Sequence, residues 1–146
     1  MNNLLEANNL SVYFDSEDGV IKAVDGISFT IKQGETLAMV GESGSGKSVS
    51  AMSLMRLNEI TNGYIASGSI KFCLSNEEMV DIVSLKDVSL QKIRGNEISM
   101  IFQEPMTSLN PVLTIGRQIS ESIELHQKLN KKDAKNKTVE MLSLVR

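Results

Sequence analysis

Lys47 and Ser48 are the residues whose types and spacing most clearly predict chemistry, because they end the segment Gly41–Ser48. This segment fits the phosphate-binding pattern G-x-x-x-x-G-K-[ST] at every constrained position. The glycines allow successive amide groups to turn toward phosphate oxygens. The lysine ammonium would reach the β- and γ-phosphates, and the serine hydroxyl would bind Mg²⁺. The predicted nucleotide-binding residues are Gly41, Glu42, Ser43, Gly44, Ser45, Gly46, Lys47 and Ser48, with Lys47 also catalytic.

Gln103 is the second residue with a predicted chemical role, because it follows the apolar segment 97–102. A glutamine at the tip of a core strand can place its amide oxygen at Mg²⁺ and the γ-phosphate. Such a residue would respond to ATP hydrolysis, because the γ-phosphate that it contacts is then lost. The alternative is an ordinary polar residue at a strand end, and spacing alone does not decide between the two.

The elements on either side of the phosphate loop support the first interpretation. Residues 35–40 are predicted to form a short buried strand, and residues 48–57 are predicted to form a helix. The helix is apolar on most of its faces, which indicates burial in the core. The phosphate-binding motif requires a strand before its glycine-rich turn and a helix after it. The alternative is a flexible Gly/Ser turn without a ligand, which would not require these two flanking elements.

The remaining chain predicts an antiparallel layer and then helices. Residues 4–14 and 20–31 are predicted strands, the second interrupted at Asp25-Gly26. Residues 58–69 are rich in turn residues, and residues 69–74 predict another strand. A short helix over 87–93 would end at Gly95. Helices are also expected over 114–128 and, after an Asn130 N-cap, to about residue 145.

Composition indicates a single ordinary domain of 146 residues, 41% of them hydrophobic. The net charge of −3 lacks the basic footprint of a nucleic-acid binder, so no nucleic-acid partner is expected. Lysines 128, 131, 132, 135 and 137 are interpreted as a solvated helix face. The single cysteine, Cys73, excludes an internal disulfide. No apolar run reaches the ~18 residues of a membrane span, and no signal peptide is visible, so we expect a cytosolic protein.

Three segments resemble the ATP-binding subunits of ABC transporters, and the last is similar to their oligopeptide, dipeptide and nickel importer branch. The segments are residues 23–29 (AVDGISF), 40–48 (VGESGSGKS) and 98–111 (ISMIFQEPMTSLNP). The resemblance implies an α/β P-loop NTPase fold, with a RecA-like parallel core and an N-terminal antiparallel β layer. It also implies a β layer and P-loop core over 1–103, and a Q-loop with the start of a helical subdomain over 104–146.

The same resemblance implies a function. The protein would bind ATP and Mg²⁺ and energise import of peptides or nickel from the cytoplasmic side of the membrane, as a peripheral subunit. Gln103 would be the Q-loop glutamine, acting in catalysis and on the metal. Residues Glu104 to Leu113 would meet the transmembrane permease subunits, and a second ATP-binding subunit would complete a homo- or heterodimer. An aromatic residue would stack on adenine, with Phe14 favoured over Tyr13 by register, although either ring could instead pack the β layer.

The chain also departs from the family's pattern. It lacks the signature Leu-Ser-Gly-Gly-Gln, an acidic strand motif with the catalytic glutamate, and a switch histidine. In family order these motifs follow position 146, so we expect the N-terminal part of a longer protein. The alternative is a nucleotide-binding fragment that does not hydrolyse ATP.

A small GTPase is a further alternative, since residues 130–133 fit the guanine-reading pattern N-K-x-D. That pattern requires a buried strand before it, whereas residues 123–129 are polar and helical in period. The D-x-x-G switch motif is also missing between the phosphate loop and this site, so we disfavour this interpretation.

Overall fold

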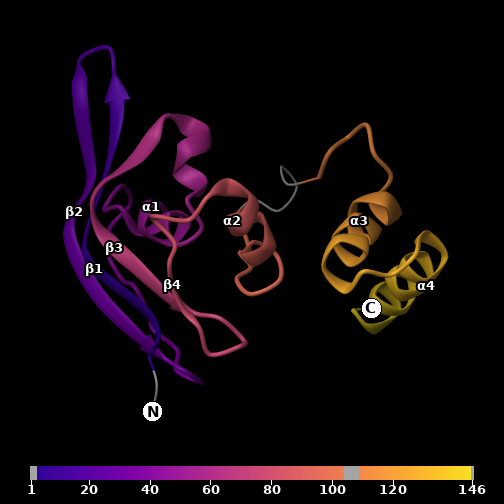
Figure 1. The fold of residues 1–146 in the computed structure, drawn as a ribbon. Helices are drawn as coiled ribbons and strands as arrows, with labels where there is room; N and C mark the ends of the chain where they lie inside the picture. The colour runs from indigo at the N-terminus through magenta and orange to yellow at the C-terminus, as the bar shows by residue number, and fades with distance from the viewer. Residues whose placement is uncertain (1–2, 104–108, 146) are drawn as a thin grey trace. The chain divides into compact units, whose positions relative to one another are not determined.

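The computed structural model describes residues 3–103 and 109–145. They divide into two compact units, residues 1–90 and residues 91–146, and each is described here by itself. The first unit carries the sheet and the phosphate loop, and the second carries a pair of helices (Figure 1). Within the described ranges, no helix has the length and apolar character that crossing a membrane would require.

The first unit is built on a four-stranded sheet in the order β2-β1-β3-β4, and every pair in it is antiparallel. The strands are β1 (Asn3–Ser16), β2 (Gly19–Lys32), β3 (Gly63–Cys73) and β4 (Met79–Asp81). Leu10, Val12 and Ile70 are fully buried on the sheet, where they form part of the core. The predicted antiparallel layer is therefore confirmed.

The predicted interruption at Asp25-Gly26 is a β-bulge within a continuous strand. Leu10 pairs with Ile27 and Val12 pairs with Val24, so two residues of β2 lie opposite Ser11. Gly26 has φ +73°, and its amide donates to the Ser11 hydroxyl at 3.0 Å. The bulge bends the strand next to the phosphate loop.

The prediction of turns through residues 58–69 is wrong for most of that segment. A 3₁₀ helix, η1 (Leu57–Thr61), comes first, and β3 already begins at Gly63. Gly68 lies inside the strand with φ +95°, where a Cβ would come 2.5 Å from the carbonyl oxygens of Asn8 and Asn9. This glycine marks a close approach of two backbones rather than a chain reversal.

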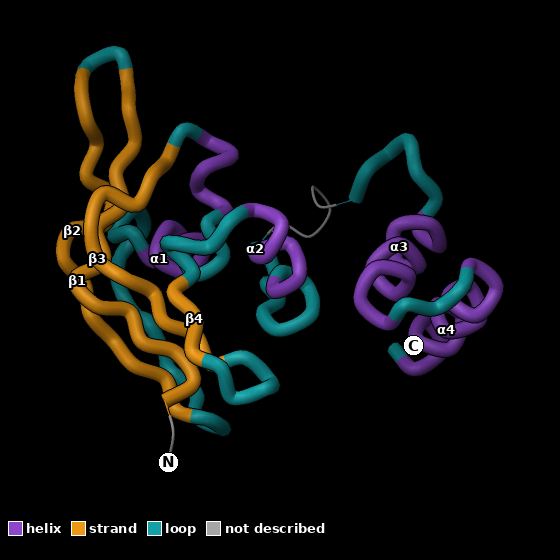
Figure 2. The backbone as a smooth tube through the Cα atoms, viewed as in Figure 1, coloured by secondary structure: helices purple, strands orange, loops and turns teal. Residues whose placement is uncertain are grey.

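The two strands predicted for a parallel core do not form within the described residues. Residues 35–40 run as a loop, and Val40 is 92% exposed (Figure 2). Residues 97–102 show one isolated parallel bridge, Arg94 to Ile98, and Ile101 is 96% exposed. A strand persists only where a neighbouring strand pairs with its amides and carbonyls. The four strands of the sheet pair only with one another, so neither segment is paired with a strand of the described residues.

The helix after the phosphate loop, α1 (Lys47–Ser53), is shorter than predicted and buries serines rather than apolar residues. The Ser53 hydroxyl donates to the Val49 carbonyl at 2.6 Å. The Asn58 amide donates to that same carbonyl at 3.0 Å and to the Ser53 hydroxyl at 2.7 Å. These bonds satisfy polar groups at the helix end, which explains why the predicted extension to residue 57 is wrong.

The other helices agree closely with expectation. They are α2 (Asp87–Ile93), α3 (Ile115–Gln127) and α4 (Lys131–Leu144). Gly95 follows α2 with φ +81°, and the Asn130 side chain caps α4 by accepting from the amides of Lys132 and Asp133. Ile123 of α3 and Ala134 of α4 are buried in the second unit. The predicted apolar stripe of α4 is only partly buried, because Met141, Leu142 and Val145 are exposed.

Candidate phosphate-binding site

The phosphate loop, residues 41–48, closes around the side chain of its own lysine. The Lys47 ammonium donates to the Gly41 carbonyl at 2.7 Å, to the Glu42 carbonyl, and to the Ser45 hydroxyl at 3.2 Å. Lys47 is the first residue of α1, so the loop and the helix start hold this cation together. A fixed ammonium beside a helix N-terminus provides two positive contributions for an incoming phosphate.

Two glycines of the loop have conformations that L side chains rarely adopt. Gly44 has φ +80° and Gly46 has φ +84°. A Cβ on Gly46 would also lie 2.5 Å from the Ala23 carbonyl oxygen on β2. The loop therefore packs directly on the backbone of the sheet, and only glycine fits at this contact.

The Ser48 hydroxyl suits a Mg²⁺ ion that is shared with a nucleotide. Ser48 is exposed at the second position of α1, and its hydroxyl makes no hydrogen bond to the described residues. Within residues 3–103 and 109–145, three or more His, Cys, Asp or Glu side chains nowhere gather to hold a metal. One hydroxyl with open space around it fits an ion whose remaining ligands are phosphate oxygens and water.

Two hollows of ligand size meet at Lys47. The larger is about 470 Å³, and residues 23–25 and 27–29 of β2, residues 37–41, Ser45 and Ser50 also line it. The smaller is about 390 Å³, and Ser48, Ala51 and Leu54 of the helix segment line it together with parts of β2 and of residues 37–39. Volumes in this range match small-ligand sites. Lys47 thus borders both hollows, and its side chain lies between the phosphate loop and the apolar side chains of β2 and residues 37–39.

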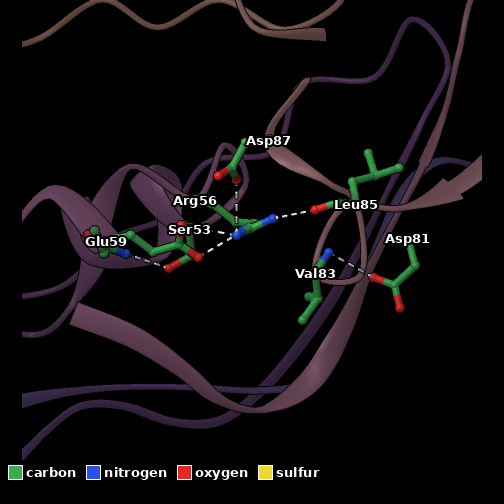
Figure 3. A network of polar contacts seen from close by, with 8 residues as sticks. Ser53, Arg56, Glu59, Asp81, Val83, Leu85 and Asp87 are labelled. Atoms are coloured by element: carbon green, nitrogen blue, oxygen red, sulfur yellow. Dashed lines mark hydrogen bonds and ion pairs between the residues drawn. The ribbon is translucent and has the colours of Figure 1, made fainter. Parts of the chain in front are cut away.

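Arg56 anchors the far end of the α1 segment to the chain that leads into α2 (Figure 3). Its guanidinium donates to the Leu85 carbonyl at 2.6 Å and to Glu59 at 2.7 Å, and it lies 3.6 Å from Asp87. The hydrogen bond to Glu59 is the main cause that raises the pKa of Arg56 above its usual value. The Arg56 side chain is only 14% exposed, whereas its ion-pair partners Glu59 and Asp87 are 43% and 81% exposed, so the partly buried bond to the Leu85 carbonyl is the contact least open to solvent. The anchor holds the helix whose first residue is Lys47.

The sequence matches the family model described as ABC transporter over residues 24–145. The chain belongs to the ABC transporter family. It is 52% identical over 145 residues to the oligopeptide transport ATP-binding protein AppD of Bacillus subtilis, covering 99% of this chain and 43% of AppD. It is 46% identical over 142 residues to OppD of Bacillus subtilis, also named an oligopeptide transport ATP-binding protein, covering 97% and 38%. The chain thus spans less than half the length of these relatives.

Solved structures of an ABC cassette have the same fold. The dimeric ATP-binding cassette MJ0796 bound to ADP and Pi superposes with a TM-score of 0.76 at 23% identity, over 95% of this chain and 56% of that one. A second dimeric structure of MJ0796 gives a TM-score of 0.74. This likeness confirms the predicted α/β P-loop fold class, although the described residues do not form the parallel strands of its core.

The two aromatic candidates for adenine stacking have different surroundings. The Tyr13 hydroxyl donates to Asp25 at 2.9 Å, and the ring meets Tyr64 edge to face with centroids 6.3 Å apart. Phe14 is half-buried, and its ring lies so close to Gly63 that a Cβ there would approach within 2.6 Å. Both rings therefore pack on the sheet. The adenine contact of Phe14 stays a prediction.

Gln103 and the expected permease-binding segment belong to the second unit. Gln103 is exposed, and residues 104–108 of the predicted segment Glu104 to Leu113 lie outside the described residues. The contact of Gln103 with Mg²⁺ and the γ-phosphate therefore stays a prediction. Residues 109–113 are described, and Val112 is 86% exposed there.

Gln118 of α3 is a residue that the sequence analysis missed. Its side-chain amide donates to the carbonyls of Asn110 and Leu113, each at 3.0 Å, and its oxygen accepts from the Asn110 amide at 2.9 Å. These three bonds fix the described part of the expected permease-binding segment. A polar residue in the first turn of a helix is common, so no sequence signal distinguished it.

Proposed function

We propose that the complete protein is the ATP-binding subunit of an ABC importer, and that it energises uptake of peptides or nickel by binding and hydrolysing ATP. The family membership and the names of the relatives support this proposal. The observation that carries it is the closed phosphate loop with Lys47 at its centre. Because the chain covers 43% of AppD, the activity belongs to a longer protein than these 146 residues.

The proposed chemistry assigns roles to residues of the predicted site. The amides of residues 42–48 and the Lys47 ammonium would hold the β- and γ-phosphates of ATP, and the Ser48 and Gln103 side chains would offer oxygen ligands to Mg²⁺. The hydrogen bonds of the ammonium to the Gly41 carbonyl and the Ser45 hydroxyl keep this charge inside the loop. These positive groups would offset the negative charge of the phosphates as the bond to the γ-phosphate breaks. The Gln103 side chain would lose its contact with the γ-phosphate after hydrolysis, so its position would depend on whether ATP or ADP is bound.

Coupling to the membrane would pass through residues 104–113, which meet the transmembrane permease subunits. The exposed Val112 offers apolar contact area, and Gln118 is hydrogen-bonded to Asn110 and Leu113 on either side of it. A second ATP-binding subunit completes the assembly, in line with the dimeric state named for the MJ0796 structures. The protein would work as a peripheral subunit at the cytoplasmic face of the membrane.

Nucleotide competition on the complete protein tests the function class. We expect ATP with Mg²⁺ to displace a fluorescent ATP analogue at least as well as GTP does, because the N-K-x-D match at residues 130–133 lies in the cap and first turn of α4. Removing Mg²⁺ with a chelator should weaken binding of ATP. A clear preference for GTP, or binding that survives Lys47→Ala unchanged, would contradict the proposal.

A further inference from the structure

The turn between α3 and α4 carries a local excess of positive charge. Five lysines and one aspartate in residues 128–137 give this segment a net charge of +4, on a chain whose net charge is −3. The segment contains one third of the chain's 15 lysines and arginines. The other side chains of the chain are therefore acidic in sum. The segment itself forms the turn between α3 and α4 and the first part of α4 (Figure 1).

Four of these lysines form what we call the basic patch: Lys128, Lys131, Lys132 and Lys135. All four are exposed, and none forms an ion pair with any residue in the described ranges. Some cations elsewhere on the two units do have partners. Arg117 pairs with Glu124 at 2.9 Å, for example, and Lys137 pairs with Glu140 at 2.9 Å. The charge of the patch is therefore not neutralised within the described structure.

The placement of the patch is electrostatically unfavourable for the chain by itself. Lys131 and Lys132 lie in the first turn of α4, where the positive end of the helix dipole opposes them. Lys131 and Lys135 are four residues apart on one helix face, so their like charges repel. Asn130 and Asp133 offset part of this effect at the helix start. A negatively charged partner would relieve both repulsions.

We propose that the basic patch binds the anionic phospholipid headgroups of the membrane surface. This inference rests on the proposed function, which places the protein at a membrane. Clusters of four or more basic residues beside a membrane are attracted to anionic lipid. The cations are all lysines, whose flexible and hydrated charges suit a diffuse lipid surface better than fixed, bidentate recognition of an acidic protein. Leu125, 65% exposed and three residues before Lys128, adds an apolar side chain at the same end of the helix pair.

Vesicle co-sedimentation of the complete protein tests the patch. We expect binding to phosphatidylcholine vesicles that contain phosphatidylglycerol, and much weaker binding to phosphatidylcholine alone. Replacing the four patch lysines with glutamine should lower the partition coefficient by about fivefold for each lysine removed. Added salt should weaken binding of the wild type more than that of the variant, because it screens the surface potential.

A matched control has the same change of charge elsewhere. Lys32, Lys71, Lys86 and Lys92 are exposed and lie outside α3 and α4, so their replacement by glutamine should leave lipid binding nearly unchanged. Equal losses in both quadruple variants would overturn the proposal, as would a patch variant that binds like the wild type. Loss of permease binding by the patch variant in lipid-free detergent would also overturn it, in favour of an acidic protein partner. ATP binding, measured without lipid, shows separately whether the proposed function holds.

Discussion

Lys47→Ala is expected to lower the rate of ATP hydrolysis by the complete protein by about 100-fold or more. Losses of this size are typical when an enzyme loses a positioned charge that stabilises the transition state. The same substitution should also weaken ATP binding by about tenfold to 100-fold, the range for a hydrogen bond to a charged group. The physical reason is that the ammonium is held at the loop by the carbonyls of Gly41 and Glu42. Phosphate release and equilibrium binding of an ATP analogue measure the two effects.

Lys71→Ala is the matched control for this prediction, because Lys71 is an exposed lysine on β3 outside the loop. It removes the same charge and should change hydrolysis by less than about twofold, as for an ordinary surface substitution. Lys47→Arg should not restore activity, since a planar guanidinium cannot occupy the position of a compact ammonium. Hydrolysis by Lys47→Ala at the wild-type rate would show that the loop does not hold the reacting phosphates.

Gly46→Ala should abolish nucleotide binding and destabilise the fold around the loop. The new Cβ would meet the Ala23 carbonyl oxygen at 2.5 Å, and the backbone would hold a left-handed φ of +84°. The unfavourable φ alone costs roughly 1–3 kcal/mol, and relieving the clash requires the loop to move away from β2. A lower unfolding midpoint together with lost ATP binding is the expected result.

Gly116→Ala provides the matched comparison, because a Cβ at Gly116 in α3 would meet nothing within 4 Å. Alanine is the better helix former, so this variant should unfold at an equal or higher temperature, with a gain of up to about 1 kcal/mol. Its ATP binding should match that of the wild type. If both glycine variants behave alike, the close contact between Gly46 and β2 does not exist in solution.

Local signals explain why much of the fold could be predicted from the sequence. The helix over 87–93 and the cap at Asn130 depend on residues within one turn of each other, and both are confirmed. The phosphate loop is equally local, since its glycines and lysine are adjacent in the chain. Such features need no information from distant segments, which is why spacing and residue type were sufficient.

Most of the features that the sequence did not predict depend on distant partners. Residues 36–40 have the composition of a strand, but composition does not supply the neighbouring strand that would pair with Val40. Gly68 has the residue type of a turn, and only its close approach to the backbone of β1 explains why a glycine lies there within a strand. Arg56 has φ +51°, and its bond to the Leu85 carbonyl joins residues far apart in the chain. The contacts of Gln118 are closer in sequence, yet a single polar helix residue gives no distinctive pattern.

Peptide-stimulated ATP hydrolysis tests the central claim most directly. The complete protein would be assembled with its permease subunits in lipid vesicles. Phosphate release would then be measured without solute and with each of a series of peptides, and with nickel. We predict that a transported solute raises hydrolysis, and that Lys47→Ala removes both the basal and the stimulated rate. Hydrolysis that no peptide or nickel changes, or that persists in Lys47→Ala, would contradict the account.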